Sequence, residues 1–156
     1  GGVFDPAGRI VVVVTSMTIR QLAREEVVTT QPDAAVPTVA ELMCERSVGS
    51  VVVTEGGCPV GLVTDRDIGL GVWDHSVPAE VTVADVMTEN PVTVEASTGV
   101  YEAFRVVSDA EIRRLPVVGP EDGRLVGIVT LDDFVVLLAG ELDGLATVIQ
   151  AESPPY

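Results

Sequence analysis

The chain has 156 residues and a formal net charge of −15, with nine Arg and no Lys. A charge this negative repels phosphate backbones and anionic lipid surfaces, so direct binding to nucleic acid or to a membrane is disfavoured. Hydrophobic residues make up 47% of the chain and aromatic residues only 4%. Because the apolar residues are mainly Val, the composition favours β-branched strands packed against small-residue helices, and hence a layered α/β fold.

The charge also points to a source. An excess of Asp and Glu with Lys eliminated resembles the composition of proteins from a high-salt cytoplasm, where screening over about 3 Å at 1 M salt removes the self-repulsion. An acidic protein from a mesophile with a GC-rich genome is the alternative. We expect a halophilic source.

Cellular location is judged from the thiols and the apolar runs. Cys44 and Cys58 have no partners at a zinc-binding spacing, which favours reduced thiols and no metal site. Charges, Gly or Pro interrupt every apolar run, and the first 16 residues lack the pattern of a signal peptide. We therefore expect a soluble cytoplasmic protein, with residues 1–16 as a vector remnant, an upstream extension or an added strand.

An internal repeat organises the rest of the chain. Val28-Thr29 recurs as Val92-Thr93, an offset of 64 residues. After a turn that is two residues longer in the second copy, the offset becomes 66, so that Asp67 matches Asp133. The two-residue insertion lies in a turn, where insertions disturb a fold least. The matched positions therefore predict that the same structural unit occurs twice.

Each copy reads as strand, helix, strand, strand, helix. In the first copy we predict an apolar helix stripe at Val36, Val39, Ala40 and Met43, strands at Val48–Thr54 and Pro59–Thr64, and a weaker helix at Asp65–Gly71. In the second copy the corresponding elements are a stripe at Val100, Ala103, Phe104 and Val107, strands at Ile112–Val118 and Leu125–Thr130, and a helix at Asp132–Ala139.

Units of about sixty residues rarely build a stable core alone, so the two copies should pack on each other about a pseudo-two-fold axis. We expect the first repeat at 17–75, a linker at 76–81, the second repeat at 82–142 and a C-terminal tail at 143–156.

These motifs together resemble the cystathionine-β-synthase (CBS) domain family, from Thr18 to about Leu142. The resemblance rests on Ser47 to Val53 and Pro59 to Asp67 in the first copy, and on Asp85 to Thr88, Pro91 to Val94, Arg113 to Val118 and Val126 to Asp133 in the second. It implies a tandem α/β (α+β) pair, or Bateman module. Such modules commonly bind AMP, ADP, ATP or S-adenosylmethionine between the copies and often associate as dimers.

The twin T-x-x-D motifs are the main candidate site. Thr64 to Asp67 and Thr130 to Asp133 fit a capping box, which stabilises a helix start by about 1 kcal/mol. The family resemblance implies that the same Thr and Asp side chains hold ribose hydroxyls, and a carboxylate is suited to accept from a vicinal diol. Both roles can coexist.

Phosphate recognition would require cations. Arg66, Arg113 and Arg114 are the candidates, because Arg offers forked donors to phosphate oxygens. Neutralising acidic neighbours is the alternative role. Alternation along a strand sends Arg113 and Arg114 to opposite faces, so one of them should face a cleft. The first copy has Gly49 and Ser50 at these positions, so the two sites should differ.

Adenine would require apolar walls. The resemblance implies Val28, Val48, Val92 and Ile112 near the base, with ordinary core packing as the alternative.

Catalysis is not indicated. No nucleophile motif surrounds His75, the only histidine, and a phosphate-binding P-loop requires a Lys that the chain lacks. We expect a non-catalytic sensor that requires no cofactor, binds an adenosine nucleotide or S-adenosylmethionine, forms a homodimer and modulates an unknown partner protein. The alternative is a ligand-free dimerisation module.

Overall fold

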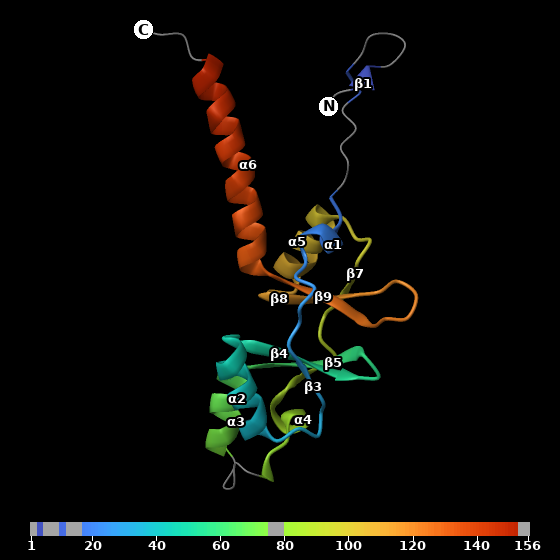
Figure 1. Cartoon of the computed structure of the whole chain (residues 1–156), viewed down its shortest axis with the longest axis vertical. Helices are drawn as coiled ribbons and strands as arrows, with labels where there is room; N and C mark the ends of the chain where they lie inside the picture. The colour runs from blue at the N-terminus through green and yellow to red at the C-terminus, as the bar shows by residue number, and fades with distance from the viewer. Residues whose placement is uncertain (1–2, 5–9, 12–16, 75–79, 153–156) are drawn as a thin grey trace.

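The computed structural model describes residues 3–4, 10–11, 17–74 and 80–152. Both repeats have the predicted order of strand, helix, strand, strand, helix, which confirms the expected fold class (Figure 1). The first repeat consists of β3 (Thr29–Thr30), α2 (Val36–Arg46), β4 (Ser50–Glu55), β5 (Cys58–Thr64) and α3 (Asp65–Asp74). The second consists of β7 (Val94–Glu95), α5 (Val100–Asp109), β8 (Arg114–Val118), β9 (Leu125–Thr130) and α6 (Leu131–Glu152). Shorter elements precede each repeat: β1 (Val3–Phe4), β2 (Ile10–Val11), α1 (Ile19–Leu22), α4 (Val83–Val86) and β6 (Thr88–Glu89). His75 lies outside the described residues.

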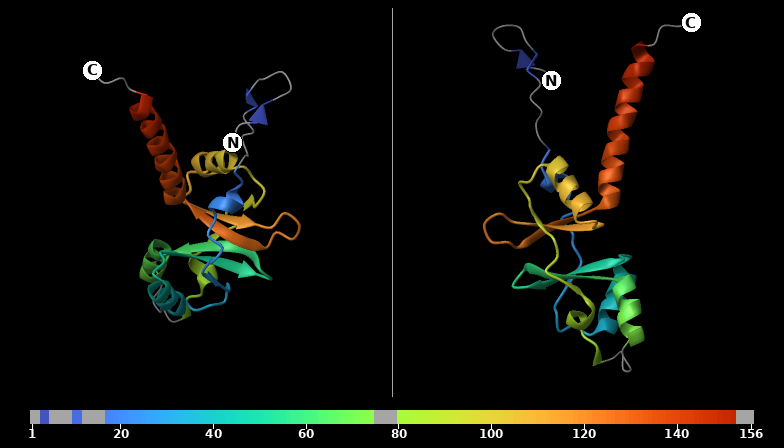
Figure 2. Two further views of the ribbon diagram at one scale, coloured as in Figure 1. Left: turned by 45° about the horizontal axis from the view of Figure 1, so that its top comes forward. Right: turned by 180° about the vertical axis from the view of Figure 1, so that it is seen from behind.

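The sheets of the two repeats face each other at the centre of the molecule (Figure 2), and β1 and β2 form a separate two-stranded sheet. The strand orders in the two repeats are β3-β4-β5-β6 and β7-β8-β9. Figure 2 shows α2 and α3 on the outer side of the first sheet and α1 and α5 on the outer side of the second. Val52 on β4 and Pro116 on β8 are each less than 2% exposed, although their neighbours along the strands pack into separate cores. Strands covered on both faces carry apolar residues without alternation, as β4 does.

Each repeat has its own core, formed where one sheet meets its helices. Val39, Met43, Val51, Val53 and Val63 belong to the first core. In the second, Ala103, Val107, Leu115, Val117 and Val129 occupy the matching positions. The helical stripes therefore face the sheets, as their spacing predicts.

Segments that precede the repeats cross over between them. Ile19 of α1 lies in the second core, and Val83 of α4 lies in the first. β6 pairs with β5, and Arg24 forms an isolated antiparallel bridge with Ile128 on β9. Each sheet is thus extended by the residues that lead into the other repeat's strands, which ties the repeats together.

Two features of the second repeat differ from what the sequence patterns suggest. Phe104 lies on the predicted apolar stripe, but it is 42% exposed, and its ring packs edge-on against Phe134 of α6, with centroids 5.7 Å apart. The last helix was predicted to end at Ala139, but α6 continues to Glu152. Gly140 and Gly144 do not end it, because a helical Gly costs only about 1 kcal/mol relative to Ala.

The crossover predicts a difference between two glycines. A Cβ on Gly127 would lie 3.0 Å from the Cβ of Ala23 and 3.1 Å from the backbone oxygen of Arg24. We expect Gly127→Ala to destabilise the fold by about 1–3 kcal/mol, since a bridged backbone cannot yield. In α3, Gly69 has open space around it, and Gly69→Ala should stabilise by up to about 1 kcal/mol. The midpoint of urea unfolding, compared between variants whose m values are equal, measures the change in stability for both substitutions. An unchanged midpoint for Gly127→Ala would contradict the close packing around Gly127.

Candidate functional site

Both T-x-x-D motifs form the capping boxes that their spacing predicts. In the second repeat, Oδ2 of Asp133 accepts hydrogen bonds from the backbone N–H and the hydroxyl of Thr130, each at 2.8 Å. In the first, Oδ2 of Asp67 accepts from the same groups of Thr64 at 2.9 and 2.7 Å. One carboxylate oxygen therefore caps each helix, and Oδ1 is the remaining acceptor for a ligand.

Arg24 uses that remaining acceptor in the second repeat. Its guanidinium donates from Nη2 to Oδ1 of Asp133 at 2.8 Å and from Nε at 3.3 Å, across 109 residues of sequence. Burial alone would raise the pKa of Asp133, but hydrogen bonds from Arg24 and Thr130 outweigh it and hold that pKa below its ordinary value. The same contact raises the pKa of Arg24. Asp133 is thus held as a carboxylate in a charge-assisted pair.

The first repeat has no such pair among the described residues. Thr88 takes the place of Arg24, because it pairs with Leu62 on β5 as Arg24 pairs with Ile128 on β9. A threonine hydroxyl carries no charge, so the two motifs differ in electrostatics although their caps are alike.

A cleft of about 260 Å³ separates the repeats next to Thr130. We call it the inter-repeat cleft. The first repeat and the segment ahead of it contribute Arg24, Glu26, Val27, Val28, Ser47, Val48, Gly49, Ser50 and Val52. The second repeat contributes Arg114, Ile128 and Thr130. A smaller cavity of about 180 Å³ adjoins it and shares Arg114 and Thr130. The two cavities together offer apolar walls, hydroxyls, guanidinium groups and the two carboxylates of Glu26 and Asp132.

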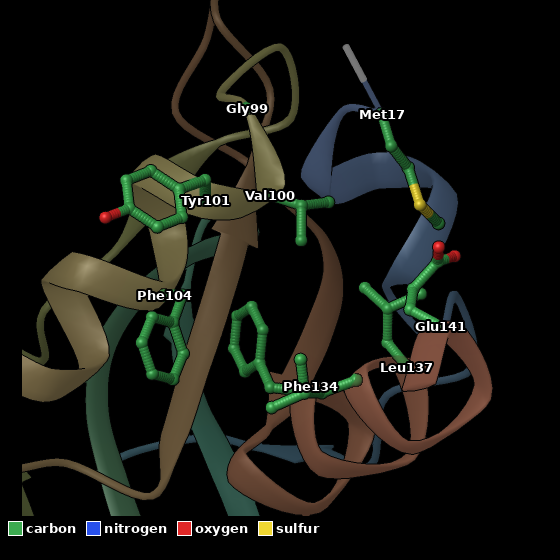
Figure 3. Close-up of a pocket in the computed structure, with 9 residues that line it drawn as sticks. Met17, Gly99, Val100, Tyr101, Phe104, Phe134, Leu137 and Glu141 are labelled. Atoms are coloured by element: carbon green, nitrogen blue, oxygen red, sulfur yellow. The ribbon is translucent and has the colours of Figure 1, made fainter. Parts of the chain in front are cut away.

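A second, apolar groove of about 460 Å³ runs between α5 and α6 (Figure 3). Its lining includes Tyr101, Phe104, Phe134, Leu137 and Leu138, of which Tyr101 is 76% exposed and Leu138 61%. Figure 3 shows the rings of Phe104 and Phe134 turned toward each other across the groove. The groove therefore exposes several large apolar side chains side by side.

Comparison with known proteins identifies the family. The family model of the CBS domain matches the chain twice, at residues 19–68 and 83–140. The chain belongs to the CBS domain family.

Its relatives place it among CBS-domain pairs. An uncharacterised protein of Methanopyrus kandleri is 38% identical over 122 residues, which cover 77% of this chain and 62% of that protein. The crystal structure of CBSX2 in complex with AMP aligns with a TM-score of 0.69 at 27% identity, over 79% of this chain and 97% of that one. The CBS domain pair of protein MJ0100, solved with 5′-methylthioadenosine and S-adenosyl-L-methionine, aligns with a TM-score of 0.70 at 22% identity, over 80% and 98%.

The CBS pair brings some of the predicted site residues together. Val28, Val48, Arg114 and Thr130 all line the inter-repeat cleft, although they come from both repeats. Asp133 lies next to this cleft, through Thr130 and Arg24. These residues make up the candidate site.

Other predicted residues lie elsewhere. Arg113 lines only the adjoining cavity and a hollow of about 390 Å³ beside α5, which also contains Ile112. Val92 is 40% exposed. Arg66 is exposed on α3, where its backbone N–H donates to Asp65. Thr64 and Asp67 form their cap outside the lining of the inter-repeat cleft.

Sequence reasoning missed Arg24. The repeat register contains the signal, because Arg24 and Thr88 are 64 positions apart, the offset of the first half of the repeat. A cation at one of two matched positions marks a site where the copies differ.

Neither metal ligation nor a membrane span is indicated within the described residues. No group of three or more His, Cys, Asp or Glu side chains in that part of the chain is arranged to hold a metal ion. None of its helices combines the length and the apolar character that a bilayer crossing requires.

The Arg24 pair predicts a pH dependence. Because the pKa of folded Asp133 is lower than in the unfolded chain, its contribution to stability is complete above about pH 4 and is lost as pH falls through the folded pKa. Asp133→Asn keeps an oxygen for the cap but removes the charge. We expect it to destabilise the protein at pH 7, with the difference from wild type narrowing toward pH 3, as measured by urea unfolding. Arg24→Gln should show the same narrowing, and a constant difference in both variants would contradict the pair.

Proposed function

We propose that this CBS pair is a non-catalytic sensor that binds an adenosine-containing ligand in the inter-repeat cleft and modulates a partner protein. The observation that carries the proposal is the convergence of apolar, hydroxyl and guanidinium groups from both repeats on one cleft. A ligand that touches both repeats can favour one arrangement of them over another, and such differential affinity is what regulation requires.

The proposal assigns each part of the ligand to residues. Adenine would contact Val28 and Val48, and the ribose would use Thr130 and Asp133. Phosphates would reach Arg114 and the adjoining cavity, which shares that residue with the cleft. The AMP bound to CBSX2 and the adenosine derivatives bound to the MJ0100 pair support this class of ligand.

We place the sensor in the cytoplasm, with its thiols reduced. Cys44 and Cys58 are both free, as expected where glutathione and thioredoxin keep thiols reduced. The chain spans 62% of the length of its Methanopyrus kandleri relative. The activity that the sensor would regulate is therefore also a proposal.

Thermal melting tests ligand binding. AMP, ATP and S-adenosylmethionine are titrated to millimolar concentration in low and in molar salt, because we propose a halophilic source. At a ligand concentration 100 times Kd, stabilisation should reach about 2.7 kcal/mol, which raises Tm. Asp133→Ala should remove the shift, whereas Asp143→Ala, at an exposed position further along α6, should retain it. No shift with any ligand in either salt would contradict the proposal.

A dimerisation role has its own support in the apolar groove. The exposed faces of α6 include Val135, Val136, Leu138 and Leu142, and Figure 1 shows this helix extending past the body of the molecule. A helix that is apolar on more than one face requires a partner. We propose a second copy of the chain, because α5 and α6 of two copies can cover each other's grooves about a two-fold axis.

Light scattering after size exclusion tests the dimer. The 16.3 kDa chain should elute with twice its monomer mass. Leu138→Ser should shift the mass toward that of the monomer, because it places a hydroxyl in the groove. Val92→Ser, which changes an exposed apolar residue outside the groove, should leave a dimer. A wild-type monomer at micromolar concentration would contradict this assignment.

A further inference from the structure

The ribose acceptor of the inter-repeat cleft already has a partner. Oδ2 of Asp133 is committed to Thr130, and Oδ1 accepts both donors from Arg24. A ribose diol that donates to Asp133 must therefore compete with a guanidinium. A neutral nucleoside that wins this competition leaves Arg24 without a counter-charge, and charge-assisted hydrogen bonds are the strong ones to lose.

Arg24 is positioned to change partners. Its backbone is fixed by two hydrogen bonds to Ile128, both 3.0 Å long, but its side chain is 66% exposed and ends on a flexible stem. Arg24 also lines the cleft together with Arg114, where Glu26 is the carboxylate among the lining residues. A phosphate on the ligand would meet two guanidinium groups in a protein whose net charge is −15.

The opposite repeat lacks both cations. Thr88 takes the place of Arg24, as the strand pairing shows, and Ser50 takes the place of Arg114, because each pairs with the threonine of its own capping box. The difference lies at the two positions where a charged ligand would be sensed, whereas the caps themselves are alike.

We infer that Arg24 is a specificity residue that makes binding in the inter-repeat cleft depend on a phosphate group. Its guanidinium pairs with Asp133 and transfers to the ligand phosphate when the ribose takes Oδ1. The inference rests on the proposed function. It assigns this cleft to phosphorylated adenosine nucleotides, in preference to adenosine or a cationic sulfonium ligand.

Calorimetric titration with adenosine and with AMP tests the assignment. All proteins carry Asp67→Asn, which keeps a cap acceptor for Thr64 and weakens any second site. The parent should prefer AMP by at least about tenfold, or about 1.4 kcal/mol. Arg24→Gln should lower the ratio of the two dissociation constants by about tenfold, with AMP binding weaker and adenosine binding unchanged or tighter.

Arg20→Gln is the matched control. Arg20 is an exposed cation of the same segment, outside the cleft lining, so its loss should leave the ratio within a factor of about two of the parent. If Arg24→Gln also leaves the ratio unchanged, or weakens both ligands equally, the assignment is overturned while the proposed site stands. If Arg20→Gln lowered the ratio as much as Arg24→Gln does, the effect would come from the loss of net charge alone, and the assignment would again be overturned. A parent that binds neither ligand overturns the proposed function and this inference together.

Discussion

Reciprocal edge pairing between the repeats is the interaction on which the rest of the structure depends. The backbone of Arg24 hydrogen-bonds in both directions with Ile128 on the second sheet, and β6 does the equivalent on the first. Because each sheet is extended by the segment that leads into the other repeat, the two cores cannot separate without breaking both edges. This exchange makes the two sheets face each other. It also explains why Val52 and Pro116 are buried between them and why a cleft lies beside them.

The same exchange makes the module asymmetric. A segment that crosses between repeats brings its side chains to the other repeat's helix start, and there the two copies carry different residues. Arg24 reaches Asp133, whereas Thr88 lies at the matching place beside β5. The two repeats therefore share the scaffold and the caps, whereas different residues at the crossover positions give the two sides different charge. A small local cation set is also the way for a chain of net charge −15 to attract an anion, because its long-range field repels one.

Features determined by neighbouring residues could be predicted from sequence. The capping boxes span four residues, and the buried stripe of Val36, Val39 and Met43 follows from helical spacing. Features determined by distant contacts could not. The Arg24 pair joins residues 109 positions apart, and the exposure of Phe104 depends on the groove beside α6. The last helix was predicted to end at Ala139, but α6 continues to Glu152, because the cost of a helical Gly is small enough for the residues beyond Gly140 to continue the helix.

A crystal structure of the full chain grown with AMP tests the central claim, that the two sides of the module are unequal and that Arg24 is the reason. We expect AMP in the cleft beside Val28, Val48 and Thr130, with its ribose on Oδ1 of Asp133 and the Arg24 guanidinium moved to the phosphate. AMP bound equally beside Thr64 and Thr130, or bound with the Arg24 to Asp133 pair intact, would contradict it.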